Sequence, residues 1–274
     1  MTDLVVRRLL IDLESEFPRR WCGGDAFRTA LFNALSMSFP LGEQFFIDSL
    51  RAGMKQLPED KQEQFAKEVQ GFIGQEATHR RIHALFNGHL VKQGFHNTWE
   101  KRIGERTPPY DKVDARHLVA ATAATEHFTA ILAEWMLENT WVFGDAEPRL
   151  RTMWMWHASE ESEHRSTAFD VYQALGGNHE WRVKWFKSVT VLFITDTARQ
   201  TLRNLWDDRA LFSWRTWRSA AKYLFGRQGL VRKTYGPWKA YLREDFHPRQ
   251  QDDQLSRDWL QANAGEFSVV GKQA

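Results

Sequence analysis

The sequence predicts an all-α protein whose main part is a four-helix bundle. Apolar residues recur at intervals of three and four over four long stretches, whereas strand-like alternation of apolar and polar residues is scarce. Each stretch is bounded by proline, glycine or a polar loop, the usual signals that start and stop helices. Four long helices joined by such loops are typical of a helical bundle.

The first predicted helix begins at the N-cap residue Asp25 and continues to about residue 57, with an interruption at Pro40. The second begins at Pro58, carries acidic residues in its first turn and ends at Gly94. Both helices therefore have suitable residue types at their predicted starts.

The third predicted helix follows the loop TPPYDK, begins near Asp114 and ends at Gly144. The fourth begins near Ala146 and continues to the Gly176-Gly177 pair, where glycine favours a helix end. Beyond this pair the spacing of apolar residues is still helical.

Charge and tryptophan content separate the bundle from the part that follows it. Residues 1–180 hold 20 Lys and Arg against 26 Asp and Glu, whereas residues 181–250 hold 15 against 5, and six of the 13 Trp. We therefore divide the 274 residues into an N-terminal segment (1–24), the bundle (25–177) and a basic, Trp-rich helical C-terminal extension (178–274).

Cysteine content limits the kinds of metal site that the chain can build. Cys22 is the only cysteine, which excludes an intrachain disulfide and a cysteine-based zinc or iron–sulfur site. Histidine and carboxylate side chains remain as metal ligands. The single thiol, and the lack of a signal-peptide pattern or a membrane-spanning apolar run, predict a cytoplasmic protein.

All four predicted helices carry ionisable side chains where the apolar pattern predicts core. Two helices each contribute one glutamate, and the other two each contribute a Glu-x-x-His pair, with a further histidine one turn before the second pair. The candidate metal ligands are Glu43, Glu76, His79, Glu126, His157, Glu161 and His164. Buried carboxylates and imidazoles need partners, which two divalent ions bridged by carboxylates would provide. This is the ligand pattern of ferritin-like di-iron and di-manganese proteins.

Four further residues, Glu160, Glu163, His83 and His127, are close to these ligands in sequence. Glu160 points about 100° away from Glu161 around the helix axis, so we expect Glu160 and Glu163 to support the site or to lie at the surface rather than to bind metal. We expect His83 and His127 to support the ligands or to be structural. Two alternatives stay open: the whole set is a row of solvated surface charges, or the further histidine is an ordinary hydrogen-bonded core residue.

Two resemblances rest on these residues. Over nearly its full length the sequence resembles a bacterial family of predicted metal-dependent hydrolases, including the stretch WHxxEExEH at 156–164 and the segment YLREDFHP at 241–248. Its ligand set is similar to that of the p-aminobenzoate N-oxygenases, ferritin-like di-iron enzymes whose H-x-x-x-E-x-x-H run matches His157, Glu161 and His164. The other four ligands match by helix and order, and this second resemblance is confined to the bundle.

A site of four carboxylates and three imidazoles suits two iron ions, with manganese as the alternative metal. The resemblance to di-iron enzymes implies O2 as co-substrate. The leading hypothesis is therefore an oxygenase or oxidase that performs N- or C-oxygenation of a small organic substrate and takes electrons from an external donor. Small residues around Glu126 either leave room for a substrate, apolar substrates included, or allow the helices to pack closely.

Two other functions compete with oxidation. A dinuclear site can also hydrolyse substrates, with Glu160 or Glu163 as the base, although seven protein ligands leave few open metal positions. A non-catalytic ferroxidase or metal-binding protein is the third option, and the large C-terminal extension argues against a simple iron store.

The segment 181–226 mixes Trp and Phe with Lys and Arg at helical spacing. It either caps the bundle, which we favour, or lies on the anionic inner face of the cytoplasmic membrane. No nucleic-acid-binding motif accompanies its positive charge, so we expect no nucleic-acid partner. A homodimer is compatible with the sequence.

Overall fold

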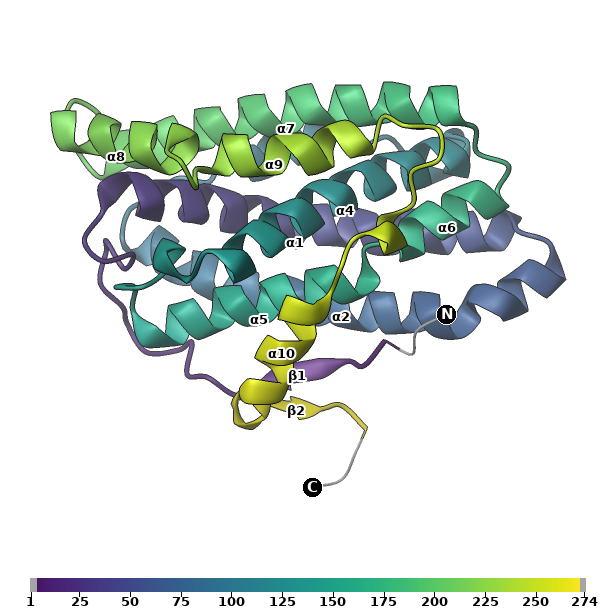
Figure 1. The fold of residues 1–274 in the computed structure, drawn as a ribbon, viewed down its shortest axis with the longest axis horizontal. Helices are drawn as coiled ribbons and strands as arrows, with labels where there is room; N and C mark the ends of the chain where they lie inside the picture. Colours follow the sequence, from purple (N-terminus) through teal and green to yellow (C-terminus); the bar gives the residue numbers. More distant parts are fainter. Residues whose placement is uncertain (1–3, 272–274) are drawn as a thin grey trace.

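The computed structural model describes residues 4–271 and confirms the predicted all-α bundle with additional C-terminal helices. Four long helices form the body of the molecule (Figure 1), with α5 beside α4 and α2 beside α1. These helices are α1 (Ala26–Gln56), α2 (Glu59–Lys92), α4 (Ala115–Glu138) and α5 (Pro148–His164).

The C-terminal part forms a further layer on the bundle, drawn at the top of Figure 1. Its helices are α7 (His179–Asp207), α8 (Trp214–Phe225) and α9 (Leu230–Ala240). The ring of Phe186 on α7 packs against Phe128 of α4 and against Tyr241, with ring centroids 5.3 and 4.2 Å apart. Buried aromatic side chains therefore attach this layer to the bundle.

The remaining elements are short. They comprise α3 (Trp99–Arg106), α6 (Thr167–Ala174), α10 (Gln254–Ala262) and a two-stranded antiparallel sheet of β1 (Arg7–Leu9) and β2 (Phe267–Val269). Single 3₁₀ turns lie at Tyr110–Lys112, Thr140–Val142, Pro248–Gln250 and Ala264–Glu266. The sequence did not predict α3 or the sheet, which joins the two ends of the chain beneath the bundle (Figure 1).

The helix starts agree with the predicted caps. The side chain of Asp25 accepts from the Arg28 N–H, and that of Asp114 accepts from the Arg116 N–H, both at 2.9 Å. The end of α4 was predicted wrongly, because the helix stops at Glu138 rather than Gly144. There Asn139 leaves helical geometry, and its side-chain amide donates to the Trp135 carbonyl at 2.9 Å.

The predicted interruption at Pro40 is also wrong, since α1 continues through this residue. A proline cannot donate to the carbonyl four residues earlier, which belongs to Ser36. The side-chain amide of Asn87 on α2 donates to that carbonyl at 2.9 Å instead. A residue distant in sequence thus satisfies the carbonyl group that the proline leaves free.

The fourth predicted helix is divided into α5 and α6 at Arg165 and Ser166. Both residues contact the C-terminal segment at this point. The Arg165 guanidinium donates to the Gln251 and Asp252 carbonyls, and Ser166 Oγ accepts from Arg249 at 3.2 Å. These tertiary contacts coincide with the change of helix direction.

The hydrophobic core consists of two main clusters, with a polar layer between them. One cluster includes Phe32, Phe86 and Trp154, and the other includes Phe72 and Phe169. On α1 and α2 the candidate metal ligands lie between residues of the two clusters, and on α5 Glu161 and His164 follow the last residue of the first cluster, Ala158. None of the helices between residues 4 and 271 has the length and apolarity needed to cross a bilayer.

Candidate metal centre

The seven predicted ligands all lie inside the bundle, in the polar layer between its two apolar clusters. Each of these residues is at most 3% exposed, and none faces solvent. The predicted alternative of a solvated row of surface charges is therefore excluded for Glu43, Glu76, His79, Glu126, His157, Glu161 and His164.

The two Glu-x-x-His pairs face each other across α2 and α5. One ligand atom from each of Glu76, His79, Glu161 and His164 lies within 4.8 Å of the others. His164 Nε2 is 3.3 Å from Glu76 Oε1, and His79 Nδ1 is 3.5 Å from Glu161 Oε1. Two carboxylates and two imidazoles at this separation can hold a metal ion.

A second group joins α1 to α2 and α5. It contains Glu43, His83 and His157, whose ligand atoms also lie within 4.8 Å of one another. We expected His83 only in a supporting position, and the structure places its Nε2 2.7 Å from His157 Nδ1. Together with the first group, Glu43 and His157 provide donors for a second ion.

Glu126 contributes in a different manner, because it belongs to neither group of converging atoms. Its Oε2 accepts from His164 Nδ1 at 2.8 Å, which leaves His164 Nε2 directed at Glu76. A carboxylate behind an imidazole is a common support for a metal-binding histidine. The other carboxylate oxygen, Oε1, has no hydrogen-bond partner among the described residues.

Unpartnered buried atoms test whether the cluster fits metal ions. Eight such atoms belong to the candidate ligands and lack a hydrogen-bond partner in the described part of the chain. They are both oxygens of Glu43 and of Glu76, Glu126 Oε1, Glu161 Oε2, His79 Nδ1 and His164 Nε2. Buried polar atoms are costly without partners, and their concentration here fits two cations that they would surround.

The electrostatics of the cluster lead to the same conclusion. Burial, together with neighbouring carboxylates, raises the pKa of Glu43 and of Glu76 well above the ordinary range. Burial also raises the pKa of Glu126, to about 7. Burial would raise the pKa of Glu161 too, but the facing imidazoles of His164 and His79 hold it well below the ordinary range. So many carboxylates share one dry site that cations are needed to keep them all ionised.

Arg7 from strand β1 holds the two glutamates that flank Glu161. Glu160 accepts from Arg7 Nη1 at 3.0 Å and from His79 Nε2 at 2.9 Å. Glu163 accepts from Arg7 Nη1 at 2.7 Å and from Gln75 at 2.8 Å. Glu160 thereby fixes His79 with Nδ1 toward the cluster, as support of the kind that was expected. Arg7 and Gln75 had no signal in the sequence pattern.

A chain of hydrogen bonds fixes the tautomer of His157. The Asn87 amide donates to the Ser36 carbonyl, so Asn87 Oδ1 accepts from Ser36 O–H at 2.8 Å. Ser36 Oγ must then accept from His83 Nδ1 at 2.8 Å, and the unprotonated His83 Nε2 accepts from His157 Nδ1 at 2.7 Å. His157 Nε2 is left without a proton, 2.8 Å from Glu161 Oε1.

An unprotonated nitrogen facing a carboxylate oxygen requires a cation near both atoms. This geometry favours His157 as a metal ligand over an ordinary core histidine. One stripe of α2 carries Glu76, His79, His83 and Asn87, which follow each other at intervals of three, four and four. This spacing could have revealed from the sequence that His83 and Asn87 belong to the hydrogen-bond chain.

His127 lies away from the cluster, although it follows Glu126 in sequence. Its Nε2 donates to the Pro237 carbonyl at 3.1 Å, and its ring contacts Tyr241 and Phe246 at centroid distances of 4.7 and 5.2 Å. Successive residues of a helix point about 100° apart, so His127 faces the C-terminal layer. Of the two roles expected for His127, the contacts correspond to the structural one and not to support of the ligands.

A family model described as a predicted metal-dependent hydrolase matches residues 5–252 of the chain. The chain belongs to this family. No curated protein and no solved structure gives a significant match. The family description and the buried His/Glu cluster together support metal dependence, whereas neither finding indicates di-iron oxygenase chemistry.

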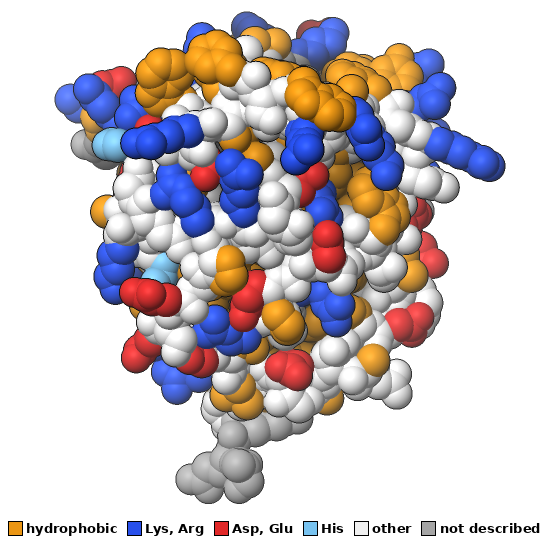
Figure 2. Space-filling model, turned by 90° about the vertical axis from the view of Figure 1, so that its left-hand side faces the viewer, with side chains coloured by type: hydrophobic (Ala, Val, Ile, Leu, Met, Phe, Trp, Pro, Cys, Tyr) orange, Lys and Arg blue, Asp and Glu red, His pale blue; other side chains and the backbone are white. Residues whose placement is uncertain are grey.

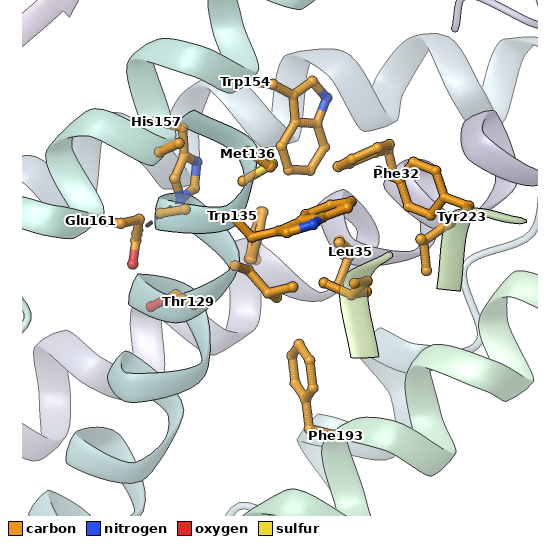
Figure 3. A pocket seen from close by; sticks show the side chains of 16 residues that line it. Phe32, Leu35, Thr129, Trp135, Met136, Trp154, His157, Glu161, Phe193 and Tyr223 are labelled. Carbon is orange, nitrogen blue, oxygen red and sulfur yellow. Dashed lines mark hydrogen bonds and ion pairs between the residues drawn. The ribbon is translucent and has the colours of Figure 1, made fainter. Parts of the chain in front are cut away.

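In this member of the predicted metal-dependent hydrolases, two largely apolar cavities adjoin the cluster. A cavity of about 30 Å³ has His157 and Glu161 at one end and aromatic side chains, among them Trp135 and Trp154, around the rest (Figure 3). A larger cavity of about 240 Å³ lies between α1, α3, α4 and α7 and has Glu43 in its wall. Phe39, Thr129 and Phe193 line both cavities.

Proposed function

We propose that the chain is a dinuclear iron enzyme that uses O2 to oxidise an apolar small molecule. The observation that carries this proposal is the cluster of buried, unpartnered carboxylate and imidazole atoms contributed by all four helices of the bundle. Oxygen and nitrogen ligands of this kind suit iron, and manganese is the second choice.

Six side chains are assigned to the metals, namely Glu43, Glu76, His79, His157, Glu161 and His164, and Glu126 supports His164 through Oε2. Two iron ions held there would supply the activation of O2. Insertion of one oxygen atom into the substrate requires O2, two electrons and two protons, and it releases one water. An external electron donor provides the electrons, since the described residues hold no redox group beyond the buried thiol of Cys22.

The protein keeps water away from the metal site and holds the metal ligands in fixed orientations. The 30 Å³ cavity beside His157 and Glu161 is lined largely by aromatic and aliphatic side chains, so it accommodates an apolar diatomic molecule better than water (Figure 3). Arg7 and Glu160 hold His79 in one orientation, and the Asn87 chain does the same for His157. Such fixed ligands keep reactive chemistry confined to one geometry.

The larger cavity supports the assignment of an apolar substrate. Its walls include Phe46, Trp99 and Val189, and the carboxylate of Glu43 borders it. Thr129 of α4, one of the small residues around Glu126, also lines it together with Ala121 and Thr125, so part of this helix leaves room for a ligand. A volume of about 240 Å³ suits a small ring or a short alkyl chain next to the metals.

Metal-dependent hydrolysis is the second candidate, and the family description favours it. A hydrolase needs a base that can take a proton from a metal-bound water. Arg7 forms ion pairs with Glu160 and with Glu163, so neither carboxylate is free to act as this base in the described geometry. The apolar walls of the cavity also suit a hydrophobic substrate better than a phosphate group.

Anaerobic and aerobic assays with defined metals separate the two candidates. The iron-loaded, reduced protein should consume O2 in the presence of an apolar substrate, and the zinc-loaded protein should be inactive. Glu105→Gln, which changes an exposed carboxylate of α3, serves as the control for Glu161→Gln. Turnover of ester or amide substrates without O2, sustained by zinc, would replace the oxidase proposal with hydrolysis.

A further inference from the structure

The outer side of the C-terminal layer carries an unusual number of exposed apolar side chains. Among the described residues, 18 large hydrophobic side chains are exposed, and 12 of them lie between Trp181 and Tyr235. We call these 12 the apolar patch: Trp181, Val191, Leu192, Ile194, Leu202, Trp206, Phe212, Trp214, Trp217, Phe225, Val231 and Tyr235. A concentration of this kind on one layer is atypical of a surface that only meets water.

Helix α7 is apolar on two opposite sides. Phe186 and Val189 are buried against the bundle, whereas Val191, Ile194 and Leu202 are exposed. From Val191 the exposed residues follow at intervals of three (Ile194), eight (Leu202) and four (Trp206). At 3.6 residues per turn these intervals place all four on one stripe of the helix. A surface helix normally has one apolar side, which packs on the core. The second, exposed apolar stripe of α7 therefore indicates a surface that binds something other than water.

Positive charge surrounds the apolar patch. Residues 181–240 contain 13 Lys and Arg and three Asp. The three acidic side chains, Asp196, Asp207 and Asp208, are at most 8% exposed and are engaged in ion pairs with arginine. Glu180 at the start of α7 is the one exposed carboxylate of helices α7, α8 and α9, so the layer presents an excess of cations to solvent.

The apolar and cationic side chains are arranged in a way that suits a flat, anionic surface. Helices α7, α8 and α9 lie in one layer at the top of Figure 1. In Figure 2 hydrophobic side chains gather along the upper edge of the molecule, with Lys and Arg side chains among and below them. Long cationic side chains beside exposed aromatic rings are typical of helices that lie at a membrane interface.

We propose that the apolar patch and its cations bind the surface of a bilayer that contains anionic phospholipids. The aromatic side chains would enter the headgroup boundary, and Lys and Arg would pair with lipid phosphates. A second copy of the same layer fits less well, because two cationic faces would repel each other. Nucleic acid fits less well too, because its backbone offers no partner for the aliphatic stripe of α7.

The apolar patch also adjoins the interior cavity. Leu192 belongs to the patch and lines the 240 Å³ cavity beside Glu43, together with its partly buried neighbour Phe193. Membrane binding by this face does not depend on what the metal cluster does, so it can be tested without turnover.

Co-sedimentation of the full-length, metal-loaded protein with vesicles tests this proposal. We expect binding to phosphatidylcholine vesicles with about 30% phosphatidylglycerol to exceed binding to pure phosphatidylcholine by about 100-fold at low ionic strength, since several cations act together. Raising the salt concentration should weaken the binding. The triple substitution Trp206→Ser, Phe212→Ser, Trp214→Ser should lower it by about tenfold or more.

Two further variants make the test specific. Leu85→Ser with Val91→Ser removes exposed apolar side chains of α2, outside the apolar patch, and should leave binding unchanged. Arg215→Gln with Arg218→Gln keeps the aromatic side chains and should weaken only the preference for anionic lipid. Thermal unfolding checks that each variant is folded.

Three results would overturn the proposal. The wild-type protein could fail to bind anionic vesicles at low ionic strength, or the triple variant could bind as well as the wild type. Light scattering could instead show a stable dimer that the triple substitution dissociates, which would assign the apolar patch to a second copy of the chain.

Discussion

His127 provides the clearest prediction about stability, because its ring is buried against the C-terminal layer and contacts none of the metal ligands in the described part of the chain. Burial lowers its pKa from 6.5 to about 4, although its Nε2 donates to the Pro237 carbonyl. The unfolded chain takes up a proton on this side chain as the pH falls through 6.5, whereas the folded chain does so only near pH 4. The contribution of His127 is therefore present above pH 6.5 and is lost as the pH falls toward 4.

The size of this effect follows from the two pKa values. The shift of roughly 2.5 units corresponds to about 3 kcal/mol of unfolding free energy at 1.36 kcal/mol per unit, and about 2 kcal/mol of it should be lost by pH 5. Substitution His127→Gln keeps an N–H group that can donate to the Pro237 carbonyl but removes the titration. The difference in unfolding free energy between wild type and variant should therefore change by about 2 kcal/mol between pH 8 and pH 5.

Urea unfolding of the metal-free protein, followed by tryptophan fluorescence at several pH values, measures this difference. Other buried groups, including His83 and His157, titrate in both proteins, so their contributions cancel in the comparison. Parallel curves for wild type and His127→Gln from pH 8 to pH 5 would show that His127 is not held neutral by the fold, and the reasoning from its burial would be wrong.

Three further substitutions test the cluster itself. Glu43→Gln should stabilise the chelator-treated protein by about 1–3 kcal/mol at pH 8, because the buried carboxyl group has two unpartnered oxygens and must either stay ionised or take up a proton on folding. It should nevertheless lower the metal content measured by mass spectrometry, and retention of both metals would exclude Glu43 as a ligand. Asn87→Leu should weaken metal binding by about 10- to 100-fold in a chelator competition, since the tautomer of His157 is no longer fixed. An unchanged affinity would show that the hydrogen-bond chain from Asn87 does not fix His157. Arg7→Met should lower the melting temperature through loss of about 2–4 kcal/mol, because Glu160 loses a charged partner in the interior, whereas Arg7→Lys should recover part of the loss.

The sequence was sufficient to predict those features that depend on local patterns. The caps at Asp25 and Asp114 and the positions of the two Glu-x-x-His pairs follow from residue types and from helical spacing. Burial of the ligands follows from the apolar residues around them, since a helix stripe with apolar neighbours faces the core.

Features that depend on distant contacts were not predicted. The continuity of α1 through Pro40 requires an amide from Asn87 on another helix, and the support of Glu160 requires Arg7, 153 positions earlier in the chain. The position of Glu126 behind His164 is equally invisible to spacing, because it depends on how α4 and α5 pack. Local spacing identifies candidate ligands, and tertiary packing decides which atom of each one faces the site.

Metal content is the measurement that tests the central claim most directly. The protein should be purified, analysed for bound metals, stripped with chelator and then titrated with ferrous iron under anaerobic conditions. The account predicts about two iron ions per chain, with fewer in Glu43→Gln and in Glu161→Gln and an unchanged number in the surface variant Glu105→Gln. A folded protein that binds neither iron, manganese nor zinc would contradict it, and the buried cluster would then be a polar layer without a metal.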